Sequence, residues 1–309
     1  MEDINKIAVL YGGSSSEREI SIQSGEGVYK AIIELGYIAE LIDINDLKDL
    51  SELKIYDFIF IALHGFEGEG GKLQKDLDDL NILYSGSSYA CCKNTWNKKL
   101  TKEILEQNNI STPIWSEISK LPSIDSPNAK LSASFFDKFR PFEAIFLKPQ
   151  EDGSSIDIFK ITNESSNKKA IQACLNPNRA FIYEEYINGK EFTVTIIDDV
   201  CFPPIEIISN NEFYDYDAKY HSNETLLIEA KLNDRELTEI NKIAFDAFKA
   251  LDCNGWARVD LIQDDDGKFY VIEINTVPGM TSHSCVPKSG SFLSLSYSDV
   301  VKKIIDASS

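Results

Sequence analysis

Trp256-Ala-Arg-Val-Asp-Leu261 and Tyr270-Val-Ile-Glu-Ile-Asn275 decide how the C-terminal part of the chain folds. Polar and apolar residues alternate in both segments, which is the pattern of β-strands. The short interval between them predicts a hairpin, and a turn over residues 265–268 places Asp260 directly opposite Glu273. Two like charges in opposed positions repel each other, and a cation between them would remove that repulsion.

The same register places Arg258 opposite Asn275 on the polar face of the hairpin. The other face carries the apolar residues Val259, Leu261, Ile272 and Ile274. Two carboxylates and an amide oxygen are hard ligands that suit Mg²⁺ bound together with substrate phosphates. The alternative is an edge hairpin with a polar outer face, and the hairpin alone favours neither. The polar, glycine-containing loop over residues 276–284 favours the metal site.

The composition is that of a globular protein with room for two or three domains. The 309 residues are 43% hydrophobic and 26% charged. The net charge of −19 argues against nucleic acid or an anionic membrane as the main partner, because both attract positive surfaces. It does not argue against ATP, since a few lysines and a metal ion set the field locally.

Cysteine usage and the N-terminal segment both indicate a location in the cytoplasm. The six cysteines form no C-x-x-C pair and the chain has three histidines, so neither a disulfide framework nor a structural zinc site is expected. The polar residues 1–6 do not resemble a signal peptide, and no apolar run approaches the roughly 20 residues that span a bilayer. We expect a cytoplasmic protein with reduced thiols.

The first ninety residues alternate between strand and helix patterns. Short apolar segments predict strands at residues 7–11, 37–44 and 58–63. Periodic apolar positions predict helices at residues 20–35 and 70–80. This order implies an α/β domain in which helices surround a parallel sheet.

From residue 98 onward the pattern changes to closely spaced strands. A helix at residues 98–108, capped by Thr95 or Asn97, leads into a surface connection rich in Ser, Pro and Lys at residues 116–142. Strands paired in hairpins with occasional helices indicate α+β domains with antiparallel sheets. The expected strands are 144–148, 156–161, 181–185, 192–197 and 202–208, and the expected helices are 164–174 and 234–251.

Two polar loops follow strands of the N-terminal domain, where α/β folds place their ligands. Gly12-Gly-Ser-Ser-Ser16 precedes a helix whose free N–H groups can bind an anion, and Glu17 can bind an ammonium group. Spacing alone favours a local alternative, a capping box formed by Ser14-x-x-Glu17 or Ser16-x-x-Glu19. The glycines of residues 64–71 let the backbone approach a small ligand, although a lone histidine such as His64 is more often structural.

Three later segments have the composition of a nucleotide site. Residues 148–155 combine a lysine with Gly-Ser-Ser amides that can surround a phosphate. The pattern is not that of a P-loop, and an ordinary surface turn is the alternative. Residues 183–191 place acidic side chains around a turn that suits a purine and a ribose, or a plain hairpin. Residues 212–220 carry four aromatic side chains, which indicates either packing against the rest of the protein or a lid that closes over a ligand.

With these motifs assembled, the chain resembles the D-alanine–D-alanine ligase family of ATP-grasp enzymes from residue 7 to about residue 287. The resemblance implies three domains, residues 1–97, 98–183 and 184–309, with ATP between the second and third, and a homodimer. The motifs that carry it stand in the order and spacing of the family: GGSSSEREIS at 12–21, HGFEGEGG at 64–71, LYSGS at 83–87, LKPQEDGSS at 147–155, EEYINGKEFTV at 184–194, FYDYDAKY at 213–220, GWARVD at 255–260 and IEINTVPGMTSHS at 272–284.

The resemblance also implies the residues that bind ATP and metal. Glu184 and its neighbours would contact the adenine, Glu191 the ribose, and the loop containing Ser154 would cover the phosphates. Two Mg²⁺ ions, for which Mn²⁺ can substitute, would be bound by Asp260, Glu273 and Asn275. The ATP contacts of the family fall on Lys98, Lys148, Ser155, Glu184, Tyr186, Ile187, Glu191 and Lys219.

The implied reaction joins two D-alanine molecules into D-alanyl-D-alanine for peptidoglycan synthesis. The first D-alanine would attack the ATP γ-phosphate to form an acyl phosphate, and the amine of the second would attack that carbonyl group. Glu17 would bind the ammonium group of the first D-alanine and Ser284 the carboxylate of the second. His64 and Cys285 would lie near the substrates.

Two further features follow from the resemblance. Arg258 and the N–H of Gly279 would stabilise the tetrahedral oxyanion, a role worth about 3–4 kcal/mol per donor in other acyl-transfer sites. Ser154, Tyr220 and Glu17 would form a hydrogen-bonded link from the lid to the N-terminal domain. Closure of the lid would protect the acyl phosphate from water.

Several positions depart from the usual pattern of the family, and the tail after Pro287 matches poorly. Gly70 stands where Asp is common, Trp96-Asn97 where Met-Asp is common, and Glu185 where Lys is common. Asp157 and Ala257 replace glycines. None of these changes removes a proposed metal ligand or oxyanion donor. The additional negative charge of Asp157 near the phosphate loop predicts weaker ATP binding or lid closure.

Two alternatives stay open at this point. One is a related ligase whose second substrate is D-lactate or D-serine, and Tyr220 fits the dipeptide ligases better than the D-lactate ligases. The other is a nucleotide-binding protein without ligase activity. The complete set of Arg258, Asp260, Glu273 and Asn275 argues against it.

Overall fold

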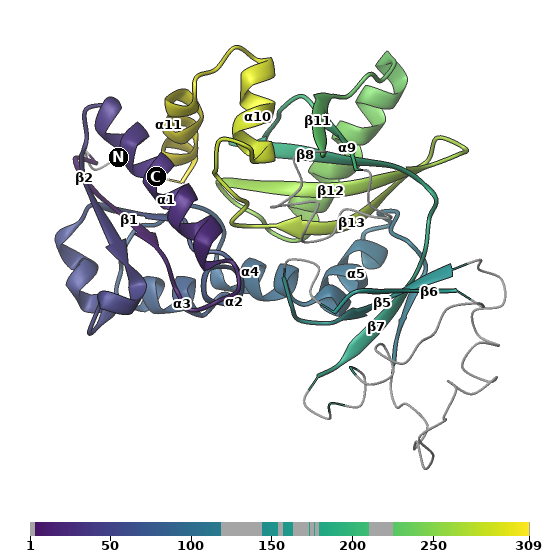
Figure 1. Ribbon diagram of the computed structural model, residues 1–309, viewed down its shortest axis with the longest axis horizontal. Helices are drawn as coiled ribbons and strands as arrows, with labels where there is room; N and C mark the ends of the chain where they lie inside the picture. Colours follow the sequence, from purple (N-terminus) through teal and green to yellow (C-terminus); the bar gives the residue numbers. More distant parts are fainter. Residues whose placement is uncertain are drawn as a thin grey trace.

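A computed structural model describes residues 4–118, 144–153, 157–162, 173, 176, 179–209 and 225–308. Within this part of the chain three β-sheets are connected by helices (Figure 1). The N-terminal sheet is parallel, has the order β2-β1-β3, and consists of β1 (Lys6–Tyr11), β2 (Ile38–Asp43) and β3 (Phe58–Ile61). The predicted parallel α/β fold of the N-terminal part is confirmed.

Helices cover this sheet because two of its strands, β1 and β3, are apolar on both faces. β3 is buried along its whole length, as expected for a strand covered on two sides. α1 (Arg18–Glu34) packs on β1 and β2, and α11 (Tyr297–Ala307) packs against α1. Figure 1 shows the two termini close together beside these helices. The C-terminal segment therefore completes the N-terminal core.

A series of short helices leads from the N-terminal sheet to the rest of the molecule. Asn97, between the last two, accepts a hydrogen bond from the Leu100 N–H at 3.1 Å and is the N-cap predicted for this junction. The helix before it was not predicted, because Tyr89-Ala-Cys-Cys-Lys-Asn-Thr-Trp96 has little apolar periodicity. The elements are η1 (Ile44–Asp46), η2 (Leu50–Ile55), α2 (Phe66–Glu69), α3 (Lys72–Asp79), α4 (Tyr89–Trp96) and α5 (Lys98–Gln107).

A four-stranded antiparallel sheet follows, with the order β4-β7-β5-β6. The strand predicted at residues 156–161 lies at 159–162, and most of the predicted connection at 116–142 falls outside the described residues. So does the predicted helix at 164–174, apart from residue 173. The strands are β4 (Trp115–Glu117), β5 (Ala144–Pro149), β6 (Phe159–Thr162) and β7 (Phe181–Glu185).

The third sheet has six antiparallel strands in the order β11-β10-β8-β12-β13, with β9 paired to β8. α9 (Asp234–Ala250) covers β8, β12 and β13, and it begins at a capping box made by Asn233 and Glu236. α10 (Cys285–Phe292) follows the last strand. The strands are β8 (Gly189–Ile197), β9 (Val200–Cys201), β10 (Ile205–Ile208), β11 (Leu226–Glu229), β12 (Trp256–Asp264) and β13 (Phe269–Asn275).

The hairpin β12–β13 has the predicted register at its polar end. Asp260 pairs with Glu273, and Arg258 pairs with Asn275. β12 lies between β8 and β13, so only β13, the second strand of the hairpin, is an edge strand of the sheet. At the turn the register differs by one residue from the prediction, because Gln263 pairs with Phe269.

A β-bulge between Asp260 and Leu261 accounts for the change of register along the hairpin. Leu261 pairs with Val271, which leaves Ile272 as the additional residue on β13. Val271 is therefore fully buried in the core, whereas Ile272 is only partly buried, like Glu273 beside it. The prediction that Ile272 belongs to the purely apolar face is wrong, because simple alternation does not detect a bulge.

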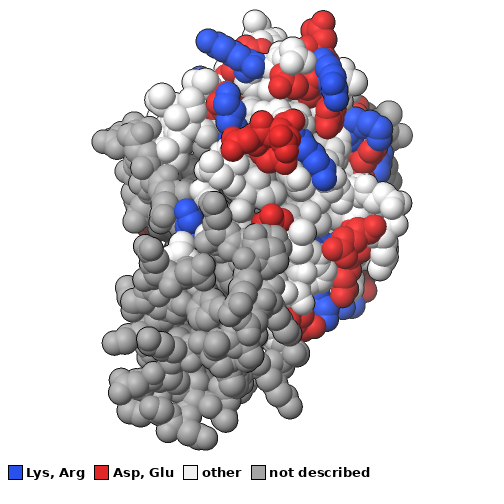
Figure 2. Space-filling view, turned by 90° about the vertical axis from the view of Figure 1, so that its right-hand side faces the viewer, with Lys and Arg blue, Asp and Glu red and all other residues white. Residues whose placement is uncertain are grey.

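The surface carries acidic and basic side chains side by side. Figure 2 shows this mixture on one face of the molecule. Several pairs are one helical turn apart, such as Lys72 with Asp76 and Lys75 with Asp79 on α3, and such exposed pairs contribute little to stability. No helix among the described residues is long and apolar enough to cross a membrane.

Candidate active site

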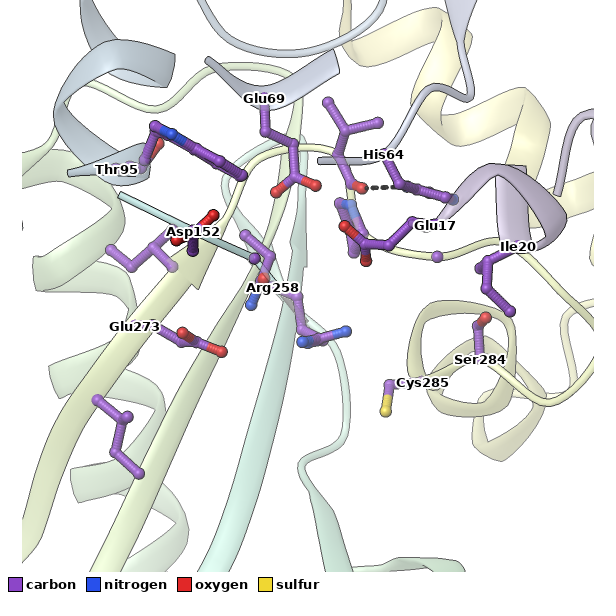
Figure 3. A pocket seen from close by; sticks show the side chains of 18 of the residues that line it. Glu17, Ile20, His64, Glu69, Thr95, Asp152, Arg258, Glu273, Ser284 and Cys285 are labelled. Atoms are coloured by element: carbon purple, nitrogen blue, oxygen red, sulfur yellow. Dashed lines mark hydrogen bonds between the residues drawn. The ribbon is translucent and has the colours of Figure 1, made fainter. Parts of the chain in front are cut away.

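A pocket of about 160 Å³ lies between the N-terminal helices, the segment after β5 and the hairpin β12–β13. Figure 3 shows acidic and basic side chains from these elements pointing into it. The predicted site residues that line the pocket are Glu17, His64, Lys98, Arg258, Glu273, Asn275, Gly279, Ser284 and Cys285. The structure thus brings together residues that are up to 268 positions apart in the sequence, from Glu17 to Cys285 (285 − 17).

Glu17 is 6% exposed and stands at the N-cap position of α1, where its side chain makes no capping hydrogen bond. Ser14 does not cap the helix either, since its N–H and Oγ donate to the Glu67 carboxylate on α2 at 2.7 and 2.8 Å. The capping-box interpretation of this loop is wrong, because Ser14 bonds to α2 and Ser16 lies one residue before the N-cap. Glu17 is left to line the pocket, as an ammonium-binding acid requires.

His64 is 4% exposed and both of its ring nitrogens have partners within the protein. Nδ1 lies 3.0 Å from the Val277 carbonyl oxygen, which can only accept, so Nδ1 carries the proton. Nε2 then accepts from the Ser24 hydroxyl at 3.1 Å, and that hydroxyl accepts from the Met280 N–H at 3.0 Å. Burial lowers the pKa of His64. The neutral ring therefore joins α1 to the loop after β13 rather than offering a nitrogen to a substrate. Figure 3 shows the hydrogen bond of His64 to this loop as a dashed line.

Glu69 on α2 is a pocket residue that the sequence analysis did not identify. Its Oε1 accepts from the Gly65 N–H at 3.0 Å. Burial of the carboxyl group, together with the negative charge of Glu17, raises the pKa of Glu69 to about 8. It could have been found from its place in residues 64–71, since this segment follows a predicted strand and contains two acids.

The hairpin contributes a cluster centred on Asp260. Arg258 donates to both carboxylate oxygens of Asp260, from Nε and Nη2, at 2.8 Å each, a bidentate geometry. Thr193 Oγ1 donates to Asp260 Oδ1 at 2.7 Å, and Asn275 Nδ2 donates to Oδ2 at 3.0 Å. The side chains of Arg258 and Asp260 are each 13% exposed. The guanidinium is thereby held in one orientation beside the pocket.

The oxygen donors of the hairpin fit a hard cation that is also bound by a ligand. Asp260 and Glu273 are directly opposed, and Asn275 is two residues beyond Glu273 on the same strand. No three His, Cys, Asp or Glu side chains converge within the described part of the chain. A protein site of this kind is open, and Mg²⁺ commonly completes such sites with phosphates and water. Because Asp260 is already hydrogen-bonded, cation binding requires an exchange of some of those bonds.

The loop after β13 leads to the start of α10. Ser284 is the N-cap residue, and its Oγ accepts from the Thr281 N–H at 3.0 Å. A Cβ on Gly279 would lie 2.9 Å from Ser284 Oγ, so only glycine fits there without displacing Ser284. The N–H groups at the start of a helix such as α10 suit a carboxylate. Cys285, the first residue of the helix, is buried.

Lys98, at the start of α5, holds the segment that follows β5. Its Nζ donates to the Asp152 carbonyl oxygen at 2.6 Å, and its N–H donates to the Gln150 carbonyl oxygen at 2.8 Å. A Cβ on Gly153 would lie 3.1 Å from Glu17 Oε2, so this segment reaches the N-terminal wall of the pocket. The predicted phosphate loop therefore begins beside a lysine and beside Glu17.

Lys148 on β5 and Glu184 on β7 are adjacent but lie outside the pocket lining. Lys148 Nζ donates to Glu184 Oε1 at 2.5 Å. Lys102 on α5, which the sequence analysis did not identify, lies 2.5 Å from Glu184 Oε2. Burial alone would raise the pKa of Glu184, but the two ammonium groups outweigh it and the pKa is lowered. Glu184 is thus a buried, charged carboxylate.

The other predicted nucleotide residues follow Glu184 along the chain. The Tyr186 ring packs edge-on against Phe146, with centroids 5.5 Å apart, and Lys160 Nζ lies 3.8 Å from its centroid. Ile187 and Glu191 are partly exposed and do not line the pocket. The predicted residues that lie outside the described part of the chain are Ser154, Ser155, Lys219 and Tyr220.

Two departures from the family pattern meet at Phe66. A Cβ on Gly70 would lie 2.6 Å from the Phe66 ring, and this ring packs against Trp96 with centroids 5.9 Å apart. Gly70 therefore makes room for an aromatic pair at the edge of the pocket. Ala257, in place of another glycine, is fully buried in the core of the six-stranded sheet.

Asp157, a third departure, is paired. Arg179 Nη1 donates to Asp157 Oδ2 and Nη2 donates to Asp152 Oδ2, each at 2.5 Å. The charge that was predicted to weaken ATP binding is therefore partly balanced. Asp157 has φ = +53°, a left-handed backbone conformation in which glycine is unstrained, and this accounts for the glycine usual in the family.

Comparison with known proteins agrees with this geometry. Residues 130–306 match the model of a family described as the D-ala D-ala ligase C-terminus. The match includes most of the segment after Pro287, so the expectation that this tail departs from the family is wrong. The D-alanine--D-alanine ligase of Marinomonas sp. (strain MWYL1) is 37% identical over 308 residues, covering 96% of this chain and 94% of the relative.

Solved structures extend the similarity to the fold. A D-alanine--D-alanine ligase from Bacillus anthracis complexed with ATP has a TM-score of 0.83 and 31% identity, covering 98% of this chain and 97% of that chain. VanG, a D-Ala:D-Ser ligase from Enterococcus faecalis, has a TM-score of 0.82 and 25% identity, covering 99% and 100%. The chain belongs to the D-alanine–D-alanine ligase family and has its ATP-grasp fold.

Proposed function

We propose that this chain uses ATP to join two D-alanine molecules into D-alanyl-D-alanine. The observation that carries the proposal is the meeting of three binding groups in one pocket. Glu17 suits an ammonium group, the start of α10 suits a carboxylate, and Arg258 suits an oxyanion between them. An amino acid that reacts at its carboxyl group needs this combination.

The first step transfers a phosphoryl group. A carboxylate oxygen of the first D-alanine, held through its ammonium group by Glu17, attacks the γ-phosphorus of ATP, and ADP leaves. Lys98 and Lys148 supply positive charge along the phosphates. Mg²⁺ or Mn²⁺, when bound by Asp260, Glu273 and Asn275, neutralises charge on the phosphates. The product is D-alanyl phosphate.

The second step forms the peptide bond. The carboxylate of the second D-alanine binds at Ser284 and the start of α10. Its amino group loses a proton and then attacks the acyl carbon. Arg258 and the Gly279 N–H stabilise the oxyanion of the tetrahedral intermediate. The intermediate collapses as the C–O bond to phosphate breaks, which releases phosphate and the dipeptide.

His64 has a supporting role in this proposal. Its ring nitrogens bind Ser24 and the Val277 carbonyl group. The loop that it fixes carries Gly279, so His64 positions an oxyanion donor. Glu69 lies in the same pocket as Glu17, and because its pKa is raised to about 8 it offers a neutral carboxyl group there at neutral pH.

The remaining nucleotide contacts belong to the proposal as well. Glu184, Tyr186 and Ile187 would hold the adenine and Glu191 the ribose. Ser154, Ser155, Lys219 and Tyr220 would act as the resemblance implies. The three domain boundaries, the homodimer and the cytoplasmic location also remain predictions.

One experiment tests the reaction and its second substrate. The protein is incubated with ATP, Mg²⁺ and D-alanine, and phosphate and dipeptide are measured. We expect the two products in equal amounts. ATP binding without either product would contradict the proposal and support a nucleotide-binding protein. Parallel incubations with D-serine and D-lactate address the related ligases, of which VanG is a structural neighbour, and we expect D-alanine to be preferred.

A further inference from the structure

Three charged side chains form a buried cluster beside the proposed ATP site. Glu184 is 2% exposed, Lys102 1% and Lys148 8%. Each ammonium nitrogen lies 2.5 Å from a different oxygen of the Glu184 carboxylate. The three side chains carry a net charge of +1. Burial lowers the pKa of Lys102, and the Glu273 carboxylate on β13 acts with Glu184 to stabilise its ammonium group. Buried charges are costly when they are not fully paired, and Lys148, the more exposed of the two lysines, can be paired further by a negatively charged ligand.

The two lysines are held differently. Lys102 Nζ donates to Thr112 Oγ1 at 2.7 Å, and Thr112 Oγ1 donates to the Val271 carbonyl oxygen of β13 at 2.8 Å. Lys148 has Glu184 as its polar partner among the described residues, and its ammonium lies 5.3 Å from the Phe146 ring centroid. An ammonium group has three donors. Lys148 therefore has donors that no described residue occupies and that can bind a ligand, while Lys102 is fixed between two sheets.

The position of Lys148 indicates what that ligand is. β5 leads from Lys148 to Gln150, whose carbonyl oxygen accepts from the Lys98 N–H, and then to Gly153 at the pocket. Lys98 and Lys102 are one turn apart on α5. Phosphates bound between Lys98 and the segment after β5 would draw the ammonium of Lys148 toward them. Glu184 would then keep a single counter-ion, Lys102.

We propose that Lys102 is a positioning residue that keeps Glu184 a charged hydrogen-bond acceptor while Lys148 turns to the phosphates. The inference rests on the proposed function, since ATP is the ligand. Without Lys102, a buried carboxylate would take up a proton and become a donor. Adenine presents an amino group at position 6, and hypoxanthine presents a carbonyl oxygen there. Lys102 would therefore determine the preference for adenine.

The test compares ATP with inosine triphosphate in the full-length protein. In Lys102→Met we expect the dissociation constant and KM for ATP to rise about tenfold or more, the scale of a hydrogen bond to a charged group. The preference for ATP over inosine triphosphate should fall by about the same factor, and the KM for D-alanine should not change. Lys99→Met removes a neighbouring lysine that pairs with exposed Glu117, and it should behave as the wild type. A folded Lys102→Met variant with the wild-type base preference would overturn the proposal.

A second pair of variants separates positioning from general destabilisation. If Lys102 acts through Glu184, adding Lys102→Met to Glu184→Gln should change the ATP dissociation constant less than about twofold. A tenfold loss in that background would show that Lys102 acts otherwise and would overturn the proposal. This pair also replaces the first test if Lys102→Met does not fold. Wild-type protein that binds no ATP would refute the proposed function itself, whereas a normal wild type with an unaffected Lys102→Met refutes only this inference.

Discussion

The charged cluster on the hairpin and the charged cluster on β7 differ in exposure and in balance. On the hairpin, Arg258 lines the pocket and is paired with Asp260; the two side chains are each 13% exposed and cancel each other's charge. On β7, Glu184 lies between two lysines, and none of the three side chains is more than 9% exposed. The hairpin carboxylate also accepts from Thr193 and Asn275.

This difference decides how each cluster can take part in a reaction. Next to a pocket, water and ligand can replace a lost hydrogen bond, so Asp260 can exchange its partners for a cation. In the interior no such replacement is available, and a carboxylate can release one counter-ion only if another remains. We therefore expect substitutions on the hairpin to reduce catalysis more than stability, and substitutions on β7 to reduce stability as well.

Glu273→Gln tests the hairpin half of this comparison and should have the largest effect. The substitution keeps the shape of the side chain and removes the charge opposite Asp260. Loss of a metal ligand in phosphoryl transfer removes several kcal/mol of charge stabilisation, so we expect kcat to fall about a hundredfold or more. Phosphate release and dipeptide formation measure the effect, with thermal unfolding unchanged.

Glu229→Gln is the matched control, because Glu229 is an exposed acid in β11 of the same sheet. Its activity should equal that of the wild type. If Glu273→Gln retains full activity, the cation-binding interpretation of the hairpin is wrong.

Glu184→Ala tests the β7 half. It leaves Lys102 and Lys148 facing each other in the interior, and loss of one partner of a buried ion pair costs about 3–5 kcal/mol of stability. We expect the free energy of unfolding in urea to fall by about that amount. Glu117→Ala is the control, since the Glu117 side chain is 42% exposed and pairs with Lys99, and it should cost less than about 1 kcal/mol. Equal losses in the two variants would contradict the distinction between the clusters.

The hairpin cluster could be predicted from the sequence and the β7 cluster could not, for a physical reason. Alternation along two strands joined by a short turn fixes which side chains are opposed, so Asp260 and Glu273 were paired correctly. Lys102 and Glu184 come from a helix and a strand 82 positions apart (184 − 102). Their contact depends on tertiary packing, which no local pattern encodes.

The same limit explains the errors near the pocket. Ile272 was assigned to the wrong face because the bulge at Asp260 and Leu261 changes the alternation. Ser14 fits a capping box by spacing, but Glu67 on a distant helix binds it instead. Both errors arise where a tertiary contact outweighs a local preference, and both lie next to the site.

Glu69→Gln extends the comparison to an acid that shares the pocket with Glu17 and has a raised pKa. Its pKa is about 8 in the folded protein against an ordinary value of 4.5, so folding favours its protonated form. That stabilisation is complete below about pH 4.5 and is lost as the pH rises to about 8. The variant should therefore lose less stability than the wild type between pH 5 and pH 8.5, measured by thermal unfolding. Parallel pH profiles would show that Glu69 is not the titrating group.

Asp157→Gly tests an ion pair that is more exposed than either charged cluster, and it should have the smallest effect. Arg179 binds both Asp157 and Asp152, so removal of one carboxylate leaves more positive charge beside the phosphate loop. We expect the KM for ATP to fall about twofold, because an exposed pair gives only a small change in the local field. Asp157→Asn keeps a side chain that tolerates φ = +53° and removes the charge. The same decrease of the KM in both variants would identify the charge as the cause. A decrease in Asp157→Gly alone would identify the backbone conformation as the cause. An unchanged KM in both would show that Arg179 already neutralises Asp157.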